Sequence, residues 1–220
     1  MERESVMIAC PINQDAEKYL DRYIGGIESL DYKNWNLFFC DNSKDNKFFG
    51  KLCDTGYTAV KVKDEGEWNK NILSSYNRLR ESFLDKEIHN FDWMLILESD
   101  VVPNPSLLKE FMRRRHPVMG CPYKLNSKMM MINTFTPWGR NENITVEDYL
   151  TKYQHLSYER VWSCGFGCII IKNWVVESTP FRISEKGKCV DTAFAEDMLK
   201  KDIPIYCKMD MPANHLRVKS

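Results

Sequence analysis

Short apolar runs alternate with amphipathic segments along most of the chain, and this order constrains the fold more than any other feature. The apolar runs are typical of buried strands, and the segments between them carry apolar residues at helical spacing. Strands separated by helices predict an α/β fold with a mostly parallel sheet, in which ligands bind at the carboxyl ends of strands. The expected strands are residues 5–10, 36–40, 58–62, 93–97, 118–122, 167–172 and 203–208, and the clearest helices are 15–30, 68–84, 104–115 and 191–201.

Composition excludes several classes of protein. The 220 residues include 31 basic and 31 acidic side chains, so the formal net charge is zero, which argues against a nucleic-acid partner held by bulk electrostatics. The eight cysteines are spread singly with no C-x-x-C, which predicts reduced thiols. Since there is neither a secretory leader nor an apolar run of roughly 18 to 20 residues, we expect a cytoplasmic protein with no transmembrane segment.

The strongest local signal is an apolar strand that runs into two carboxylates, Glu98 and Asp100. Residues at i and i+2 of an extended chain point to the same side. Mg²⁺ and Mn²⁺ take oxygen ligands and are commonly shared between carboxylates and the phosphates of a substrate. This pair therefore favours a divalent-cation site, and the alternative is a solvated turn in which Asp100 caps the next helix.

The sequence Leu-Glu-Ser-Asp-Val-Val-Pro over residues 97–103 resembles the D-x-D-type motif of the GT-A fold glycosyltransferases, especially those related to family 2. Glu98 stands where the family usually has aspartate, so Asp100 is the safer metal ligand. Cys-Asp-Asn-Ser-Lys-Asp over residues 40–45 resembles the family's D-N-S-x-D turn, whose first aspartate contacts the nucleotide base. The other segments that carry the resemblance are residues 8–13, 76–78, 163–169 and 191–215.

The resemblance implies one GT-A (Rossmann-like) domain over residues 1–220, with a nucleotide-sugar-binding half over about 1–103 and an acceptor-binding half over about 104–220. It implies transfer of a sugar from a UDP- or GDP-sugar to a hydroxyl of a carbohydrate, lipid or small molecule, with Mn²⁺ or Mg²⁺ and with inversion. A retaining transferase, a nucleotidyltransferase and a non-catalytic sugar-nucleotide-binding module stay open as alternatives. The chain could also be a domain of a larger enzyme.

The same resemblance assigns candidate site residues. Asp100 and His215 are the expected metal ligands. Asp191, at the start of a predicted helix, is the expected catalytic or acceptor-binding carboxylate, with Glu196 as the second candidate. The expected contacts with the nucleotide sugar are Ala9, Pro11, Asn13, Asp41, Lys70, Arg78, Glu98, Ser99 and Gly165.

Residues 124–160 match nothing in the family pattern, and in this fold the acceptor usually binds in that region. Trp138 lies in this stretch and Trp162 lies two residues beyond its end, and both are candidates for stacking on a sugar face. The alternative is that both are core or rim tryptophans. Met129–Ile132 is a possible strand, and residues 145–154 are expected to form a helix behind a threonine cap.

Overall fold

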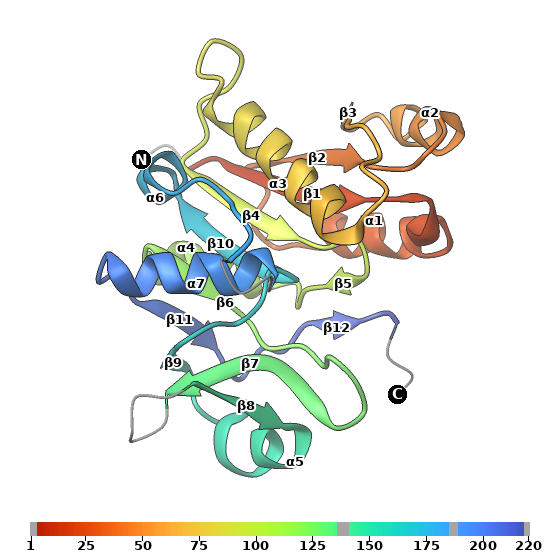
Figure 1. The fold of residues 1–220 in the computed structure, drawn as a ribbon. Coiled ribbons are helices and arrows are strands. Elements are labelled where there is room, and N and C mark those ends of the chain that lie inside the picture. The colour runs from red at the N-terminus through yellow and green to blue at the C-terminus, as the bar shows by residue number, and fades with distance from the viewer. Residues whose placement is uncertain (1–3, 136–140, 185–188, 218–220) are drawn as a thin grey trace.

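The computed structural model describes residues 4–135, 141–184 and 189–217, and an eight-stranded sheet lies at its centre (Figure 1). The strand order is β3-β2-β1-β4-β10-β6-β11-β9. The first four strands in this order run parallel, β10 runs antiparallel to β4 and β6, and β11 is parallel to β6. The strands are β1 Val6–Ile12, β2 Trp35–Asp41, β3 Thr58–Lys61, β4 Trp93–Leu97, β6 Val118–Gly120, β9 Tyr158–Val161, β10 Cys168–Lys172 and β11 Ile205–Lys208.

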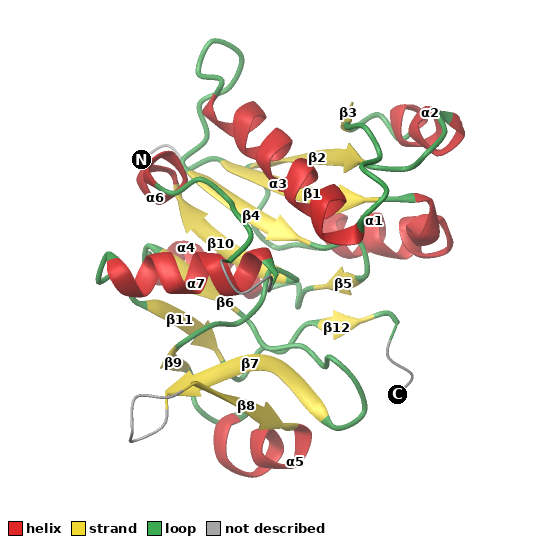
Figure 2. Cartoon of the chain, in the orientation of Figure 1, coloured by secondary structure: helices red, strands yellow, loops and turns green. Residues whose placement is uncertain are grey.

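Helices cover both faces of the sheet, so the molecule has two cores. Alternation along β4 shows the division, because Trp93, Leu95 and Leu97 enter one core while Met94 and Ile96 enter the other. In Figure 2 the long helices α3 and α7 lie in front of the sheet. The helices on the Met94 side are α3 Trp68–Leu84, α6 Asn173–Ser178 and α7 Val190–Lys200, and those on the Trp93 side are α1 Leu20–Glu28, α2 Lys47–Asp54 and α4 Leu107–Arg114.

Two smaller sheets extend the second half of the chain. β7 Met129–Phe135 and β8 Asn141–Thr145 form an antiparallel ribbon beside the main sheet (Figure 1). The short helix α5 Val146–Asp148 follows β8, and the Thr145 side chain accepts a hydrogen bond from the Asp148 amide, which confirms the predicted cap. In the other small sheet, β5 Val101–Val102 pairs antiparallel with β12 Asn214–His215. This pairing joins the end of the described chain to the carboxyl end of β4.

The prediction of a mostly parallel α/β sheet is confirmed, and α3 and β4 begin and end at the predicted residues. Helix α7 begins at Val190, one residue before the predicted start, so Cys189 is its N-cap and Asp191 lies inside the first turn. The eight cysteines, all among the described residues, are free thiols. No helix in the described ranges is both long enough and apolar enough to cross a membrane.

Candidate active site

The pairing of β5 with β12 brings His215 to Asp100. His215 lies opposite Val101 in this pairing, and the Leu216 amide donates to the Asp100 carbonyl at 2.7 Å. The imidazole Nδ1 lies 2.7 Å from the carbonyl oxygen of Lys124, to which it donates, and Nε2 lies 3.3 Å from Asp100 Oδ2. The carbonyl of Lys124 therefore fixes the ring with Nε2 turned toward the carboxylate.

Asp100 carries two basic partners on one oxygen. Arg217 forms an ion pair with Oδ2, with Nε at 2.5 Å, and the His215 ring approaches the same atom. Burial opposes the ionisation of Asp100, but the hydrogen bond from His215 and the charge of Arg217 outweigh it and lower the pKa of Asp100. The hydrogen bond with Asp100 is also the main cause that raises the pKa of His215. Asp100 is consequently ionised at neutral pH.

Glu98 is held by Tyr76 of α3. The Tyr76 hydroxyl donates to Glu98 Oε1 at 2.8 Å, and the Tyr76 ring packs edge-on against Phe166 with 5.2 Å between ring centroids. Burial, together with the nearby charge of Asp100, raises the pKa of Glu98 to about 7. The two carboxylates of the predicted motif therefore differ in environment, since Asp100 has cationic partners and Glu98 has a neutral phenol.

These side chains line one cleft with two compartments, which share Trp68, Ile72, Glu98, Asp100 and Arg217. We call the first the asparagine compartment, because Asn13, Asn42 and Asn71 line it together with Pro11 and Ser99; its volume is about 110 Å³. We call the second the aromatic compartment, because Tyr76, Tyr123 and Phe166 line it together with Asp191 and His215; its volume is about 270 Å³.

Of the two candidate catalytic carboxylates, Asp191 alone lines this cleft. Asp191 lies in the first turn of α7, at the wall of the aromatic compartment. Glu196 is on the same helix, but its Oε2 lies 3.8 Å from Arg182 Nη2, and Glu196 lines neither compartment. Asp197, the next residue, makes the closer contact with Arg182 at 2.6 Å. The structure therefore gives only one of the two candidates access to a ligand in the cleft.

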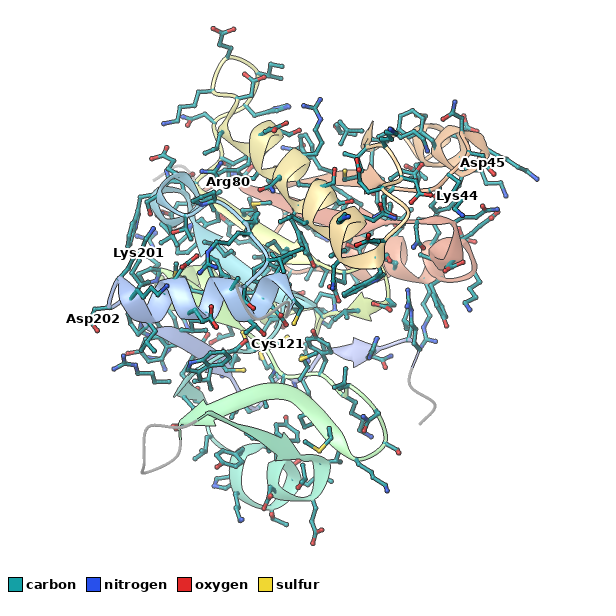
Figure 3. All side chains as sticks on the ribbon, viewed as in Figure 1. Lys44, Asp45, Arg80, Cys121, Lys201 and Asp202 are labelled. Atoms are coloured by element: carbon teal, nitrogen blue, oxygen red, sulfur yellow. The ribbon has the colours of Figure 1, made fainter. Side chains whose placement is uncertain are left out.

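The turn after β2 contributes a different residue than the resemblance implies. Asp41 is fully buried, and its carboxylate accepts from Ser43 Oγ at 2.5 Å and from Lys61 Nζ at 2.7 Å. The following residue, Asn42, lines the cleft and donates to Ser75 Oγ of α3 at 3.0 Å. Lys44 and Asp45 continue this turn at the outer edge of the molecule (Figure 3). Asp41 thus shapes the turn, and Asn42 faces the ligand space.

Three further candidates lie away from the cleft. Ala9 is fully buried in the core between β1 and α3. Lys70 pairs with Glu67, and Arg78 pairs with Glu81, on the exposed side of α3. Both cations line a separate hollow that contains neither Glu98 nor Asp100. The structure accordingly brings Pro11, Asn13 and Ser99 to the cleft beside Glu98 and Asp100. The three candidates Ala9, Lys70 and Arg78 lie outside it.

The glycine-rich segment makes room for the aromatic lining. Gly165 has a positive φ of 67°, and a Cβ there would lie 2.7 Å from the Tyr123 hydroxyl. A Cβ on Gly167 would lie 2.3 Å from Cζ of the same tyrosine, and the Gly167 amide donates to the Tyr123 hydroxyl at 3.0 Å. Tyr123 packs edge-on against His215 with 5.7 Å between ring centroids. Gly165 itself is not part of the cleft lining, so it acts through Tyr123.

We therefore expect Gly167→Ala to destabilise the protein by about 1–3 kcal/mol, because the new methyl group would overlap the buried Tyr123 ring and force the ring or the backbone to shift. The shift in the urea midpoint at constant m-value measures this loss. Gly50→Ala is the matched control, since Gly50 lies inside helix α2 with open space around its Cβ position. Alanine is expected to be neutral or stabilising there, by up to about 1 kcal/mol. Equal midpoints for the two variants would contradict the close contact with Tyr123.

Sequence reasoning missed several residues that line the cleft. Trp68, Ile72 and Tyr76 follow one another at intervals of four along α3, so they share one face of the helix. That spacing was visible in the sequence, and it separates this face from the one that carries Lys70 and Arg78. Tyr123 had no local signal, because only its packing against distant glycines places it in the site.

Asp100 and His215 are suitable ligands for a divalent cation. A carboxylate oxygen and an imidazole nitrogen face each other at 3.3 Å, and the second ring nitrogen of His215 is already bound, as in many metal-binding histidines. The described residues contain no group of three or more histidine, cysteine and acidic side chains arranged to hold a metal ion. The donor set therefore fits a cation that takes its remaining ligands from a substrate and from water, as Mg²⁺ often does.

Comparison with known proteins agrees with this architecture. No family model and no curated protein matches the sequence. Among solved structures, GalNAc-T7 with UDP, GalNAc and Mn²⁺ aligns with a TM-score of 0.67 at 7% identity, over 99% of this chain and 44% of that chain. S. aureus TarS 1-349 in complex with UDP-GlcNAc aligns with a TM-score of 0.60 at 13% identity, over 98% of this chain and 59% of that chain.

A third structure, A197 from STIV, aligns with a TM-score of 0.52 at 17% identity, over 82% of this chain and 84% of that chain. GalNAc-T7 and TarS are GT-A glycosyltransferases. The chain has the GT-A fold of these enzymes, which confirms the fold expected from its motifs. It spans less than two thirds of the length of either enzyme.

Proposed function

We propose that this chain is a glycosyltransferase that moves a sugar from a UDP- or GDP-sugar to an acceptor hydroxyl, with a divalent cation and with inversion at the anomeric carbon. The observation that carries this proposal is the common cleft of Asp191, Asp100 and His215 in a GT-A fold. Residues 1–103 would bind most of the donor, and residues 104–220 would bind the acceptor. The acceptor that carries this hydroxyl would be a carbohydrate, a lipid or a small molecule.

The donor would lie across both compartments. Asn13 and Asn42 offer amide donors and acceptors for the edge of a base in the asparagine compartment. Arg217 borders both compartments and supplies positive charge where a diphosphate would pass. The sugar would then extend into the aromatic compartment, toward Asp191. A solved neighbour with UDP and another with UDP-GlcNAc support this class of donor.

Asp100 and His215 are the residues that would hold Mn²⁺ or Mg²⁺. When bound, such a cation neutralises the charge that develops on a leaving diphosphate. The contribution of the chain is orientation, because the Lys124 carbonyl and the β5–β12 pairing hold the imidazole beside the carboxylate.

Asp191 would act on the acceptor. In an inverting transfer, its carboxylate would remove the proton of the acceptor hydroxyl as the oxygen attacks the anomeric carbon from the face opposite the diphosphate. The apolar and aromatic side chains around Asp191 would exclude water, which would otherwise compete with the acceptor and hydrolyse the donor.

Thermal shift measurements test the donor class. The purified chain is melted with UDP-, GDP-, CMP- and TDP-sugars, each with Mn²⁺ and with EDTA. A ligand that binds only the folded state adds about 2.7 kcal/mol to the free energy of unfolding when its concentration is a hundred times its Kd. The melting temperature rises as a result. We expect a UDP- or GDP-sugar to shift the melting temperature with Mn²⁺ and much less with EDTA. A cooperative melt with no shift across the panel would contradict the proposal.

Arg217 and a divalent cation would compete for Asp100 Oδ2. We therefore expect Arg217→Ala to bind Mn²⁺ more tightly than the wild type in the absence of nucleotide, by about two- to fivefold, the range expected for loss of a partly exposed ion pair. Electron paramagnetic resonance of free Mn²⁺ measures this affinity. Arg217→Lys keeps the charge and should change the affinity less. Weaker Mn²⁺ binding by Arg217→Ala would show that the guanidinium supports the cation instead of competing with it.

A further inference from the structure

Trp68 is the tryptophan with the most exposed side chain among those described, with 66% of its surface accessible. It opens helix α3 and lines both compartments of the cleft. Trp174 is also exposed, at 46%, but it lines neither compartment. A single exposed tryptophan needs no special explanation, whereas an exposed indole at the boundary of a ligand cleft indicates a contact surface.

The two tryptophans expected to stack on a sugar are not found in this position. Trp162 packs against the core on the Met94 side and lines a separate recess beside α7, and Trp138 lies outside the described residues. Trp35 packs against the opposite core, and Trp93 is fully buried. Within the described part of the chain, Trp68 is therefore the only indole that a ligand in the cleft can reach.

The surroundings of Trp68 indicate which part of a ligand it meets. Trp68, Ile72 and Tyr76 share one face of α3, and this face leads from the exposed indole to the Tyr76 hydroxyl that binds Glu98. Exposure falls along this stripe, since Ile72 is half-buried and Tyr76 is buried. Trp68 thus lies at the exposed end of this stripe, where the two compartments meet.

We propose that the indole of Trp68 packs against the apolar face of the sugar ring carried by the nucleotide donor, and so contributes to the choice of that sugar. This inference rests on the proposed function. A base held by Asn13 and Asn42 would occupy the asparagine compartment alone, and an acceptor near Asp191 would occupy the aromatic compartment alone. The donor sugar follows the diphosphate from this boundary into the aromatic compartment, so it is the part of the donor that passes the indole on its way toward Asp191.

The chemistry of both partners fits this contact. One face of a pyranose presents mainly C–H groups, and the electron-rich face of an indole attracts such weakly positive hydrogens. Burying the exposed indole against the ring also removes apolar surface from water. Leu125, which is 45% exposed and lines the aromatic compartment, offers a second apolar surface there. A nucleoside diphosphate without a sugar would gain no affinity from Trp68.

The test compares a nucleotide with and without its sugar. Isothermal titration calorimetry with Mn²⁺ gives the Kd of UDP and UDP-GlcNAc, and of GDP and GDP-mannose, for the wild type, Trp68→Ala and Trp174→Ala. We expect Trp68→Ala to raise the Kd of the sugar nucleotide by about three- to tenfold, which is the range for one aromatic contact. The Kd of UDP or GDP without a sugar should stay within about twofold of the wild-type value. Trp68→Phe should recover part of the loss, and Trp174→Ala should change neither ligand.

Each other outcome has a distinct meaning. Equal weakening of UDP and UDP-GlcNAc would overturn the proposal, because Trp68 would then contact the base or the diphosphate. No weakening of either would overturn it as well. A wild-type chain that binds none of the four ligands would contradict the proposed function itself, and the inference would fall with it. Equal melting temperatures of the wild type and the two alanine variants show that the comparison concerns folded protein, as expected for exposed side chains.

Discussion

Replacing Asp191 by asparagine is expected to lower the turnover of sugar transfer by about two to four orders of magnitude, the usual contribution of a general base. The amide has nearly the same shape as the carboxylate but does not accept the proton of the acceptor hydroxyl. Asp191 lies in the aromatic compartment and does not line the asparagine compartment, so the Kd of the donor should change little. Steady-state kinetics together with calorimetry of the donor separate these two quantities.

Glu196→Gln is the informative comparison, because it makes the same chemical change on the same helix. The Glu196 carboxylate faces Arg182 and lines neither compartment, so its loss should have a much smaller effect on turnover. If Glu196→Gln were the crippling change and Asp191→Asn were mild, the catalytic carboxylate would be wrongly assigned. If both were mild, the chain would use a different base or none.

The elements that were predicted correctly have strong local patterns. Helix α3 shows its apolar stripe over 17 residues, and β4 is an unbroken run of five buried side chains. Helix α2 was missed because Gly50 lies in its middle and only Phe48 and Leu52 are buried, whereas α4, which has the same length, buries four side chains. Local periodicity determines where a helix lies but not which of its faces meets a ligand. The resemblance assigned Lys70 and Arg78 to the nucleotide sugar, although the face of α3 with Trp68 and Tyr76 is the one that lines the cleft.

The turn after β2 could have been predicted more accurately from alternation. Cys40 packs on the same side of the sheet as α3, whereas Phe39 packs on the opposite side. A period of two therefore places Asn42, not Asp41, toward α3, and Asn42 does bind Ser75 of that helix. The family resemblance pointed to the first residue of the motif, and the pleat of the strand favours the second.

No comparable sequence pattern predicts the pairing of β5 with β12, which brings His215 to Asp100. β5 and β12 have two residues each, which is too short for any periodic pattern. Their register is decided by tertiary packing between distant segments, so no local rule could place His215 opposite Val101. His215 and Asp100 were nevertheless expected together, because the family pattern carries that long-range information in the order of its motifs.

Asp100→Asn should lower turnover by about three orders of magnitude and remove its dependence on Mn²⁺. The change keeps the volume of the side chain but removes the negative charge that His215 and Arg217 share. Loss of a cation at a leaving diphosphate costs several kcal/mol of transition-state stabilisation, and each 1.36 kcal/mol is tenfold in rate. Rates measured over a range of Mn²⁺ concentrations and in EDTA, with Mn²⁺ binding followed by electron paramagnetic resonance, give both readouts.

Glu110→Gln provides a matched control for Asp100→Asn, since Glu110 also pairs with an arginine, Arg113, at 2.7 Å, but lies on α4 outside the cleft. It should keep the wild-type rate and the wild-type Mn²⁺ affinity. A wild-type chain that works equally well in EDTA would refute the cation assignment. Asp100→Asn would then still be expected to slow transfer, because Arg217 would lose the carboxylate that holds its guanidinium at the boundary of the two compartments. That boundary is where we propose that the diphosphate passes.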